Sequence, residues 1–233
     1  MKKLLKRLLG IILLIAFCAG GFYTAMGYGM YHAKVAEQSI EDRIEKVRAD
    51  ADYTALSDVP EIYKEAVISV EDSRFYKHSG VDAVALVRAM VANIRQKEFV
   101  QGGSTISQQF AKNLLFSHEQ SLSRKIAELF ATHYIEKNYE KDEILELYMN
   151  VIYYGDGYYN IREASEGYFG VLPCNLTPYQ ATMLAGIPNA PSVYAPTKNL
   201  DLAEKRQDKV LEQMVESGAI TRDEMNEILE DGR

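Results

Sequence analysis

The residues that most resemble catalytic machinery are an acidic pair, Glu71 and Asp72, which ends the apolar run 67–70. A carboxylate delivered into a partly dry setting has a raised pKa, and a raised pKa is what a general base needs near neutral pH. An aromatic residue, His78 and Gly80 follow within the next turns of chain. The same pattern also fits an ordinary helix with an acidic last turn, so other motifs must decide between the two interpretations.

A second candidate is the polar segment 102–113, which begins with two glycines that let a ligand approach the backbone. If the segment is helical, one arc of the helix carries hydroxyls, amides and an ammonium group, from Ser104, Thr105, Gln108, Gln109 and Lys112. The opposite arc carries the core-facing residues Ile106, Phe110 and Leu114. A solvated helix face usually shows Glu and Lys instead, so this arc favours binding of a sugar and its phosphate.

A third candidate is Arg124-Lys125 followed by Glu128, one helical turn later. Read alone, Arg124 and Glu128 form an ordinary i,i+4 ion pair, worth about 0.2–0.5 kcal/mol. Beside Lys112 the same residues form a candidate binding site for a pyrophosphate, which cationic side chains bind through charge-assisted hydrogen bonds.

The elements that must position these residues are helices, because apolar residues recur at helical spacing and strand signals are sparse. Caps and prolines predict where the helices begin and end. The helices expected after the N-terminal region cover about 61–71, 82–96, 104–115, 123–139, 142–152, 161–169, 177–186, 202–216 and 221–230. The fold class is therefore mainly α.

The N-terminus has the pattern of a membrane anchor. Four basic residues within positions 2–7 precede the stretch 8–33, which has no formal charge. About 20 apolar residues span a bilayer as a helix, and flanking basic residues favour the cytoplasmic side. The chain is thus expected to cross the cell membrane once, with its N-terminus in the cytoplasm and the remainder outside. A cleaved signal peptide is the alternative, although its apolar core would be shorter.

The 233 residues suffice for one sizeable domain with appendages. We expect a cytoplasmic basic tip and transmembrane anchor at 1–33, a helical stalk at 34–58 and a catalytic domain at 59–233. The net charge of −7 gives no reason to expect nucleic acid as a partner. A disulfide between Cys18 and Cys174 is not expected, because Cys18 lies in the apolar run.

Together these stretches resemble the peptidoglycan glycosyltransferases, the transglycosylase domain family of class A penicillin-binding proteins. The family pattern E-D-x-x-F-x-x-H-x-G is complete at Glu71, Asp72, Phe75, His78 and Gly80. The pattern G-G-S-T-I-x-Q-Q-x-x-K-N is complete over 102–113, R-K-x-x-E over 124–128, and K-x-x-I-L-E-x-Y-x-N over 141–150. The order of the motifs is that of the family from about residue 59 onward, and the ordered set is highly specific.

The resemblance implies a lysozyme-like, two-lobed helical domain, with a large lobe and a small membrane-proximal jaw, behind an N-terminal transmembrane helix. It implies polymerisation of lipid II, with the membrane, lipid-linked nascent glycan and cell-wall synthesis proteins as partners. No organic cofactor is implied, and a divalent cation (Mg²⁺ or Mn²⁺) near the second carboxylate is an option.

By the same resemblance Glu71 is the general base, and Glu128 assists the departing pyrophosphate directly or by organising its basic neighbours. The residues implied in substrate binding are Asp72, Arg74, Phe75, His78, Ser104, Thr105, Gln108, Gln109, Lys112, Asn113, Arg124 and Lys125. Two separated carboxylates also resemble the arrangement in inverting glycosidases.

Neither Ser-x-x-Lys nor Lys-Thr-Gly occurs in this sequence, so the acyl-transfer machinery of bifunctional penicillin-binding proteins is not within it. We expect either a monofunctional enzyme or the first domain of a longer one. Two rival functions stay open at this point. One is a lysozyme-like hydrolase, which would need no cationic site for a lipid pyrophosphate, and the other is an inactive membrane-anchored scaffold that binds glycan.

Overall fold

The computed structural model describes residues 2–96, 102–116 and 121–232. In these residues the regular elements are α-helices and short 3₁₀ turns, with one isolated β-bridge between Gly155 and Tyr158. The prediction of a mainly α fold is confirmed.

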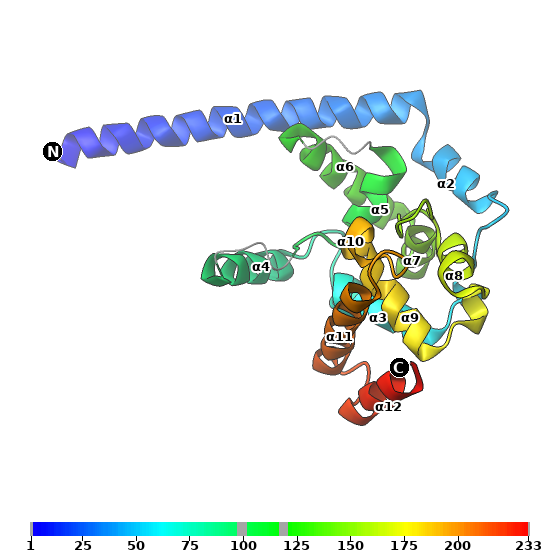
Figure 1. Cartoon of the computed structure of the whole chain (residues 1–233). Coiled ribbons are helices and arrows are strands. Elements are labelled where there is room, and N and C mark those ends of the chain that lie inside the picture. The colour runs from blue at the N-terminus through cyan, green and yellow to red at the C-terminus, as the bar shows by residue number, and fades with distance from the viewer. Residues whose placement is uncertain (1, 97–101, 117–120, 233) are drawn as a thin grey trace.

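The first helix, α1 (Lys2–Glu37), is by far the most extended element and projects out of the body toward its N-terminus (Figure 1). Its N-terminal part packs against nothing, and its large apolar side chains are open, with Phe17 80% exposed. Among the described residues it is the one helix long and apolar enough to cross a membrane, over Lys6–Glu37. The apolar helix expected at the N-terminus is therefore present.

Directly after α1 the chain packs against the helical domain. The side chain of Ser39 caps α2 (Ile40–Arg48) by accepting a hydrogen bond from the Asp42 amide at 3.0 Å. Ile40 and Ile44, one turn apart on α2, are each 1% exposed and lie in the main core cluster. Within the segment 34–58, which the sequence predicted to be a helical stalk, the apolar face of α2 packs into the core cluster.

The body consists of short helices around one core. α3 (Glu61–Glu71) packs against α9 (Pro178–Gly186) and α11 (Leu200–Ser217), and α5 (Ile106–Leu115) packs against α6 (Leu122–Asn138) and α7 (Lys141–Met149). The remaining helices are α4 (Ala83–Gln96), α8 (Ile161–Phe169), α10 (Pro191–Tyr194) and α12 (Arg222–Gly232), and the 3₁₀ turns are η1 (Leu56–Asp58), η2 (Phe75–Lys77), η3 (Pro173–Asn175) and η4 (Ile187–Asn189).

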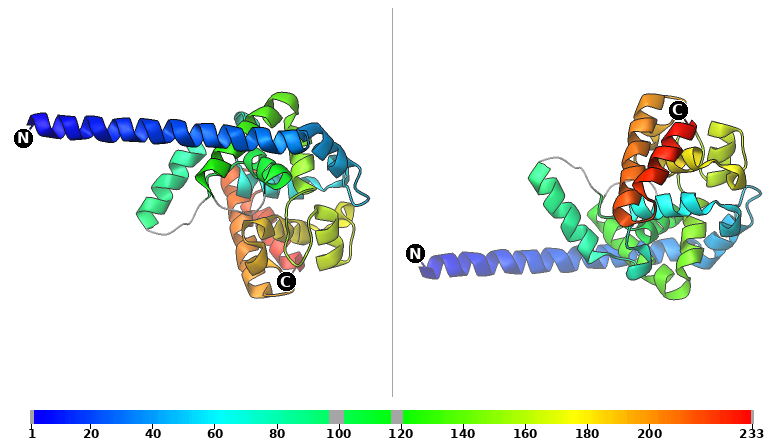
Figure 2. Two further views of the ribbon diagram at one scale, coloured as in Figure 1. Left: turned by 90° about the horizontal axis from the view of Figure 1, so that it is seen from above. Right: turned by 90° about the horizontal axis from the view of Figure 1, so that it is seen from below.

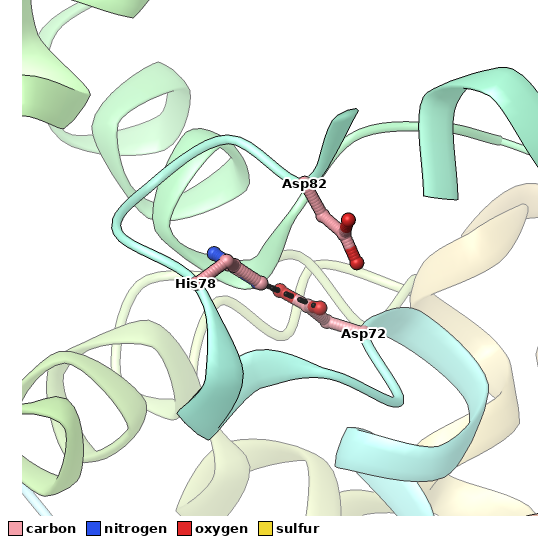
Figure 3. Close-up of side chains that lie close together, drawn as sticks. All are labelled: Asp72, His78 and Asp82. Atoms are coloured by element: carbon pink, nitrogen blue, oxygen red, sulfur yellow. Dashed lines mark hydrogen bonds and ion pairs between the residues drawn. The ribbon is translucent and has the colours of Figure 1, made fainter. Parts of the chain in front are cut away.

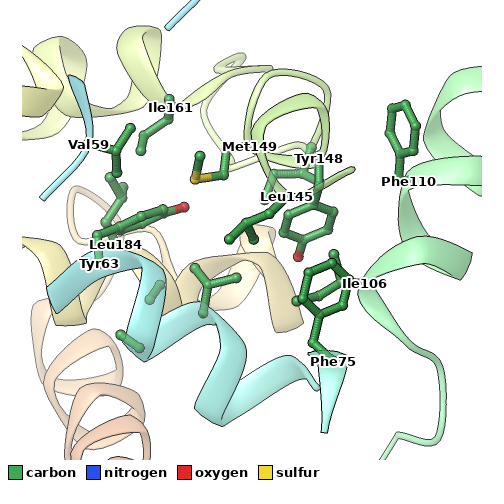
Figure 4. Packing of buried hydrophobic residues seen from close by; sticks show 14 of the residues in the cluster. Val59, Tyr63, Phe75, Ile106, Phe110, Leu145, Tyr148, Met149, Ile161 and Leu184 are labelled. Atoms are coloured by element: carbon green, nitrogen blue, oxygen red, sulfur yellow. The ribbon is translucent and has the colours of Figure 1, made fainter. Parts of the chain in front are cut away.

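Large side chains from distant helices fill the core (Figure 4). Tyr63 of α3, Phe110 of α5 and Tyr148 of α7 are fully buried there, and Leu184 of α9 packs with them. Burying each such side chain stabilises the fold by about 1.5–3 kcal/mol. The hydroxyl of Tyr63 forms a hydrogen bond with that of Tyr154 at 2.5 Å, so its polar atom is not left unpaired. The core thereby fixes the end of α3, from which the candidate base projects.

Helix α4 stands apart from the other body helices (Figure 1). In all views it extends on the same side of the body as the free half of α1 (Figure 2). The side chains of Val84, Leu86, Val87 and Met90 on α4 are each largely exposed. An exposed apolar helix beside a candidate membrane anchor gives the molecule one apolar side.

Candidate active site

Glu71 is the last residue of α3, because Asp72 leaves the helical conformation with φ −159° and ψ 72°. The Glu71 Oε2 atom accepts a hydrogen bond from the Gln109 side-chain amide at 2.5 Å. Its Oε1 atom is buried and has no hydrogen-bond partner among the described residues. Burial raises the pKa of the Glu71 carboxyl, and the Gln109 hydrogen bond and the charges of Arg206 and Lys112 oppose this rise. A buried carboxylate with one free oxygen is suited to accept a proton.

The second carboxylate, Glu128, lies on α6 and is 0% exposed. Arg124 Nε approaches its Oε1 atom at 3.0 Å, and Lys125 Nζ approaches its Oε2 atom at 3.0 Å. Lys125 Nζ also donates to Ser104 Oγ at 3.2 Å, which joins the start of the polar segment to α6. A charge this deeply buried is tolerated because both of its oxygens have cationic partners.

Lys112 on α5 connects the two carboxylates electrostatically. Burial lowers the pKa of the Lys112 ammonium, as do the charges of Arg124 and Lys125, whereas Glu128 and Glu71 raise it. The Lys112 ammonium group therefore interacts electrostatically with both carboxylates and with Arg124 and Lys125 of α6. The structure brings the three sequence motifs into one charged, partly dry site.

The predicted polar arc of α5 is divided in the structure. The helix begins at Ile106, so Thr105 is its N-cap and forms a capping box with Gln108, in which Gln108 Oε1 accepts from the Thr105 amide at 3.0 Å. The Thr105 hydroxyl donates to the Gly80 carbonyl at 2.6 Å. Both side chains are buried and engaged within the protein, and the substrate contact expected of Thr105 and Gln108 stays a prediction.

The other residues of this segment keep an orientation toward the site or the surface. Ser104 accepts a hydrogen bond from Lys125, and Gln109 donates one to Glu71. The charge of Lys112 interacts with both Glu71 and Glu128. Asn113 is partly exposed at the next position of α5. The core-facing arc is as expected, since Ile106 and Phe110 are fully buried.

Asp72 and His78 lie beside Asp82 in a network that fastens the chain after α3 (Figure 3), and Arg74 joins this network through Asp82. His78 Nε2 lies 2.9 Å from Asp72 Oδ2, and the Ile106 amide donates to the same oxygen at 3.1 Å. Arg74 Nε pairs with Asp82 Oδ2 at 2.9 Å. These contacts hold the start of α5 against the end of α3, and so they set the distance between Gln109 and Glu71.

Two neighbours complete this network. Asp82 Oδ1 accepts from the amides of Val84 and Ala85 at 2.9 and 3.1 Å, and thereby caps α4. Phe75 is 0% exposed, with Lys141 Nζ 4.5 Å from the centre of its ring. Phe75 packs the loop onto the core, and the part in substrate binding expected of it stays a prediction.

The site does not offer a divalent cation a good place at Glu128. Both carboxylate oxygens face cations there, so a metal ion would have to displace Arg124 or Lys125. Donor atoms of Asp72, His78 and Asp82 do lie within 4.8 Å of one another. Those donors are already engaged with each other, with Arg74 and with backbone amides.

Arg206 on α11 was not identified from the sequence. Its Nε donates to the Gly186 carbonyl at 3.2 Å, and its guanidinium lies 5.8 Å from the centre of the Tyr194 ring. Its charge lowers the pKa of the Glu71 carboxyl, because α11 packs against α3, the helix that Glu71 ends. The signal in the sequence is an arginine on the apolar face of a helix, aligned with the buried residues Ala203 and Val210.

Comparison with known proteins identifies the family of the chain. The family model described as Transglycosylase matches residues 37–215. The chain is 42% identical to penicillin-binding protein 1A/1B of Bacillus subtilis over 205 residues, which is 88% of this chain and 22% of that protein. It is 43% identical to the candidate transglycosylase H16_A0665 of Cupriavidus necator, over 78% of this chain and 79% of that protein.

A further relative is penicillin-binding protein 1A of Aquifex aeolicus, 41% identical over 75% of this chain and 24% of the relative. The crystal structure of penicillin-binding protein 1A from Haemophilus influenzae aligns with 55% of this chain and 16% of its own, with a TM-score of 0.38 and 28% identity. The chain thus spans about a quarter or less of the penicillin-binding proteins it matches. The matched family is the one that the motifs resemble, and the chain belongs to the transglycosylase family.

Proposed function

We propose that this protein is a peptidoglycan glycosyltransferase that polymerises lipid II into glycan strands. The observation that carries the proposal is a set of contacts: Gln109 of α5 donates to the buried carboxyl of Glu71, while Lys125 of α6 pairs with the buried Glu128 and donates to Ser104, just before α5. This arrangement places a buried base beside a cluster of cations, which is what transfer of a sugar from a lipid pyrophosphate requires. Membership in the transglycosylase family supports the same reaction.

Glu71 acts as the general base. It takes the proton from the 4-hydroxyl of the acceptor lipid II sugar while that oxygen attacks the anomeric carbon of the lipid-linked growing chain. A new glycosidic bond forms, the bond from the anomeric carbon to the pyrophosphate oxygen breaks, and undecaprenyl pyrophosphate departs with inversion. The free and buried Oε1 atom of Glu71 supports this role.

Lys112, Arg124 and Lys125 stabilise the negative charge that develops on the pyrophosphate. Preorganised cations in a partly dry site are worth more than the same charges in water. Glu128 holds Arg124 and Lys125 through its two oxygens and keeps them together before substrate binds. Ser104, Gln109 and Asn113 are the remaining α5 residues placed to contact sugar or phosphate, whereas Asp72, Arg74 and His78 support the site from behind.

The membrane is the second partner in this proposal. The chain is anchored by α1, and the exposed apolar residues of α4 lie on the same side as its free half (Figures 1 and 2). Enzyme and lipid substrate then diffuse in the same plane, with the undecaprenyl tail in the bilayer. We propose the orientation expected from the basic residues before α1, with the N-terminus in the cytoplasm and the catalytic body outside.

The test is incubation of the detergent-solubilised full chain with labelled lipid II, followed by gel separation of products. A ladder of polymer supports the proposal. A parallel assay on pre-formed glycan identifies the hydrolase alternative by new reducing ends without polymer. Binding of glycan with neither activity identifies the scaffold alternative.

A further inference from the structure

The membrane-proximal end of α1 is packed tightly onto α6. Gly27 is buried at this crossing. A Cβ atom at position 27 would lie 2.6 Å from Ile126 Cγ2, 2.7 Å from Ile126 Cβ and 2.9 Å from the Ser123 carbonyl oxygen. Separations this short essentially never occur for a real Cβ, so any side chain larger than hydrogen at position 27 must move one of the two helices.

Contacts on the C-terminal side of Gly27 keep the crossing in register. The rings of Tyr28 and Tyr31 lie 5.3 and 6.1 Å from the ring of Phe130 on α6. Farther along, the Arg43 guanidinium donates to the carbonyl of Lys34 at 3.3 Å. The same guanidinium donates to the carbonyl of Leu114, the penultimate residue of α5, at 3.5 Å. The end of α1 is therefore held against both helices that carry the cations.

The face of α6 that receives Gly27 lies opposite the face that carries the chemistry. Ser123 and Ile126 contact position 27, while Arg124, Lys125 and Glu128 alternate with them in the same one and a half turns. A helix moves as a rigid unit over so short a length, because its backbone hydrogen bonds link every residue to the next turn. Displacement of Ser123 and Ile126 therefore displaces the three charged side chains.

We propose that Gly27 is a positioning residue, which fixes how α6 packs against the anchor helix α1. The packing of α6 in turn determines the positions of Glu128, Arg124 and Lys125. The anchor would then be part of the catalytic unit as well as a tether. This inference rests on the proposed function where it is measured through polymerisation.

The test compares Gly27→Ala and Gly27→Leu with Gly29→Ala and Gly29→Leu in the full chain in detergent. Gly29 is the matched control, because it lies two residues away on the same helix and a Cβ there would meet nothing within 4 Å. A misplacement of about 1 Å at a catalytic constellation can cost roughly a hundred-fold in rate. The Gly27 variants should lose kcat on that order, with Leu worse than Ala, while the Gly29 variants keep the wild-type kcat.

A compensating exchange separates positioning from general damage. Gly27→Ala combined with Ile126→Gly removes the two Ile126 atoms that the new Cβ would meet at 2.6 and 2.7 Å and leaves the Ser123 carbonyl oxygen at 2.9 Å, so the double variant should recover part of the lost kcat. The midpoint of thermal unfolding and the membrane fractionation should stay close to wild type in Gly27→Ala. An equal kcat in the Gly27 and Gly29 variants, or no recovery in the double variant, would overturn the inference.

A second readout does not depend on turnover. Hydrogen exchange of the α6 amides over 123–128 should accelerate in Gly27→Ala and not in Gly29→Ala, while the amides of α11 stay unchanged in both. If the wild-type chain made no polymer, the proposed function would fail. The exchange measurement would still decide whether Gly27 fixes the packing of α6 against α1. Unchanged exchange of the α6 amides in Gly27→Ala would overturn the inference.

Discussion

At the scale of single residues, the buried carboxylate of Glu71 lowers the stability of the folded protein when it is ionised. Burial raises the pKa of its carboxyl in the folded protein above the unfolded value. A group of this kind stabilises the fold fully below its unfolded pKa, and the contribution is lost as the pH rises through the folded pKa. At neutral pH the ionised carboxylate is therefore less favourable in the fold than a neutral side chain of the same shape would be.

Glu71→Gln should consequently separate activity from stability. The amide cannot accept the proton, and general-base assistance is typically worth about 10²–10⁴-fold, so polymerisation should fall by at least about a hundred-fold. Calorimetry at neutral pH should show a melting temperature at or above that of wild type. Asp72→Ala is the comparison, since removing the side chain leaves His78 and the Ile106 amide without their hydrogen-bond partner and should lower the melting temperature. Full activity in Glu71→Gln would show that another group is the base.

The charge of Arg206 opposes the rise in the pKa of Glu71. Replacing Arg206 with Leu should raise that pKa further, because the ionised base loses a favourable charge. The acid limb of kcat/KM, which reports the base in the free enzyme, should move to higher pH. Arg206→Lys keeps the charge and should move the limb less. An acid limb that stays in place in Arg206→Leu would separate Arg206 from the base.

Lys112 offers a cleaner test of the pyrophosphate site than Arg124. Removing Arg124 would leave the buried Glu128 short of a partner, at about 3–5 kcal/mol of stability. Lys112 makes no ion pair within 4.0 Å among the described residues. Lys112→Met should therefore remove one positive charge from the proposed pyrophosphate site with little change in the melting temperature. Losing one charge-assisted bond in the transition state costs about 1.5–3 kcal/mol, roughly ten- to a hundred-fold in kcat. Wild-type turnover in Lys112→Met would place the phosphates elsewhere.

At the scale of elements, the start of α5 determines the geometry of the site. Thr105 caps the helix and also donates to the Gly80 carbonyl, in the loop that carries His78. One hydroxyl thus holds α5 in register with the chain that follows Glu71. Gly80 itself has φ +86°, and a Cβ there would lie 2.9 Å from Thr132 Cγ2, so the loop has no room to adjust at this point.

Thr105→Ala should therefore affect both stability and turnover. Loss of an N-cap side chain costs about 0.5–2 kcal/mol, and chemical denaturation will measure it. Turnover should fall as well, because Gln109 and Lys112 are carried by the same helix. Thr105→Ser retains the hydroxyl and should stay near wild type in both measurements. Equal behaviour of the Ala and Ser variants would show that the hydroxyl is not what holds α5.

At the scale of the whole molecule, the apolar surface is concentrated on one side. The free half of α1 and the exposed face of α4 lie on that side, and the charged site is carried by the body behind them (Figure 2). A membrane on that side would cover both apolar surfaces at once. The arrangement fits an enzyme whose substrate has its tail in the bilayer and its sugar outside.

The full chain should accordingly fractionate with membranes and resist extraction by high salt and by alkaline carbonate. A reporter fused after Arg233 should be active only outside the cytoplasm if the basic residues before α1 set the orientation. A shortened soluble form in untreated cells would show instead that the apolar segment is cleaved. Extraction of the intact chain by carbonate would show that α1 does not span the bilayer.

The sequence by itself determined the class of fold, the apolar N-terminal helix and the motifs of the site. Helical periodicity is a local property, and it predicted the helices that carry Glu71, Lys112 and Glu128 before any packing was known. The ordered motifs predicted the family, and the charge-free stretch after the basic tip predicted the apolar helix.

Only the tertiary structure decided which side chains of these motifs reach the site. Whether a hydroxyl at position 105 faces a ligand or caps a helix depends on which residue begins the helix and on the carbonyl of Gly80 nearby. Arg206 enters the site because α11 packs beside α3, and Gly27 matters because α1 crosses α6. Such contacts join residues far apart in the chain, and local periodicity carries no information about which distant faces will meet.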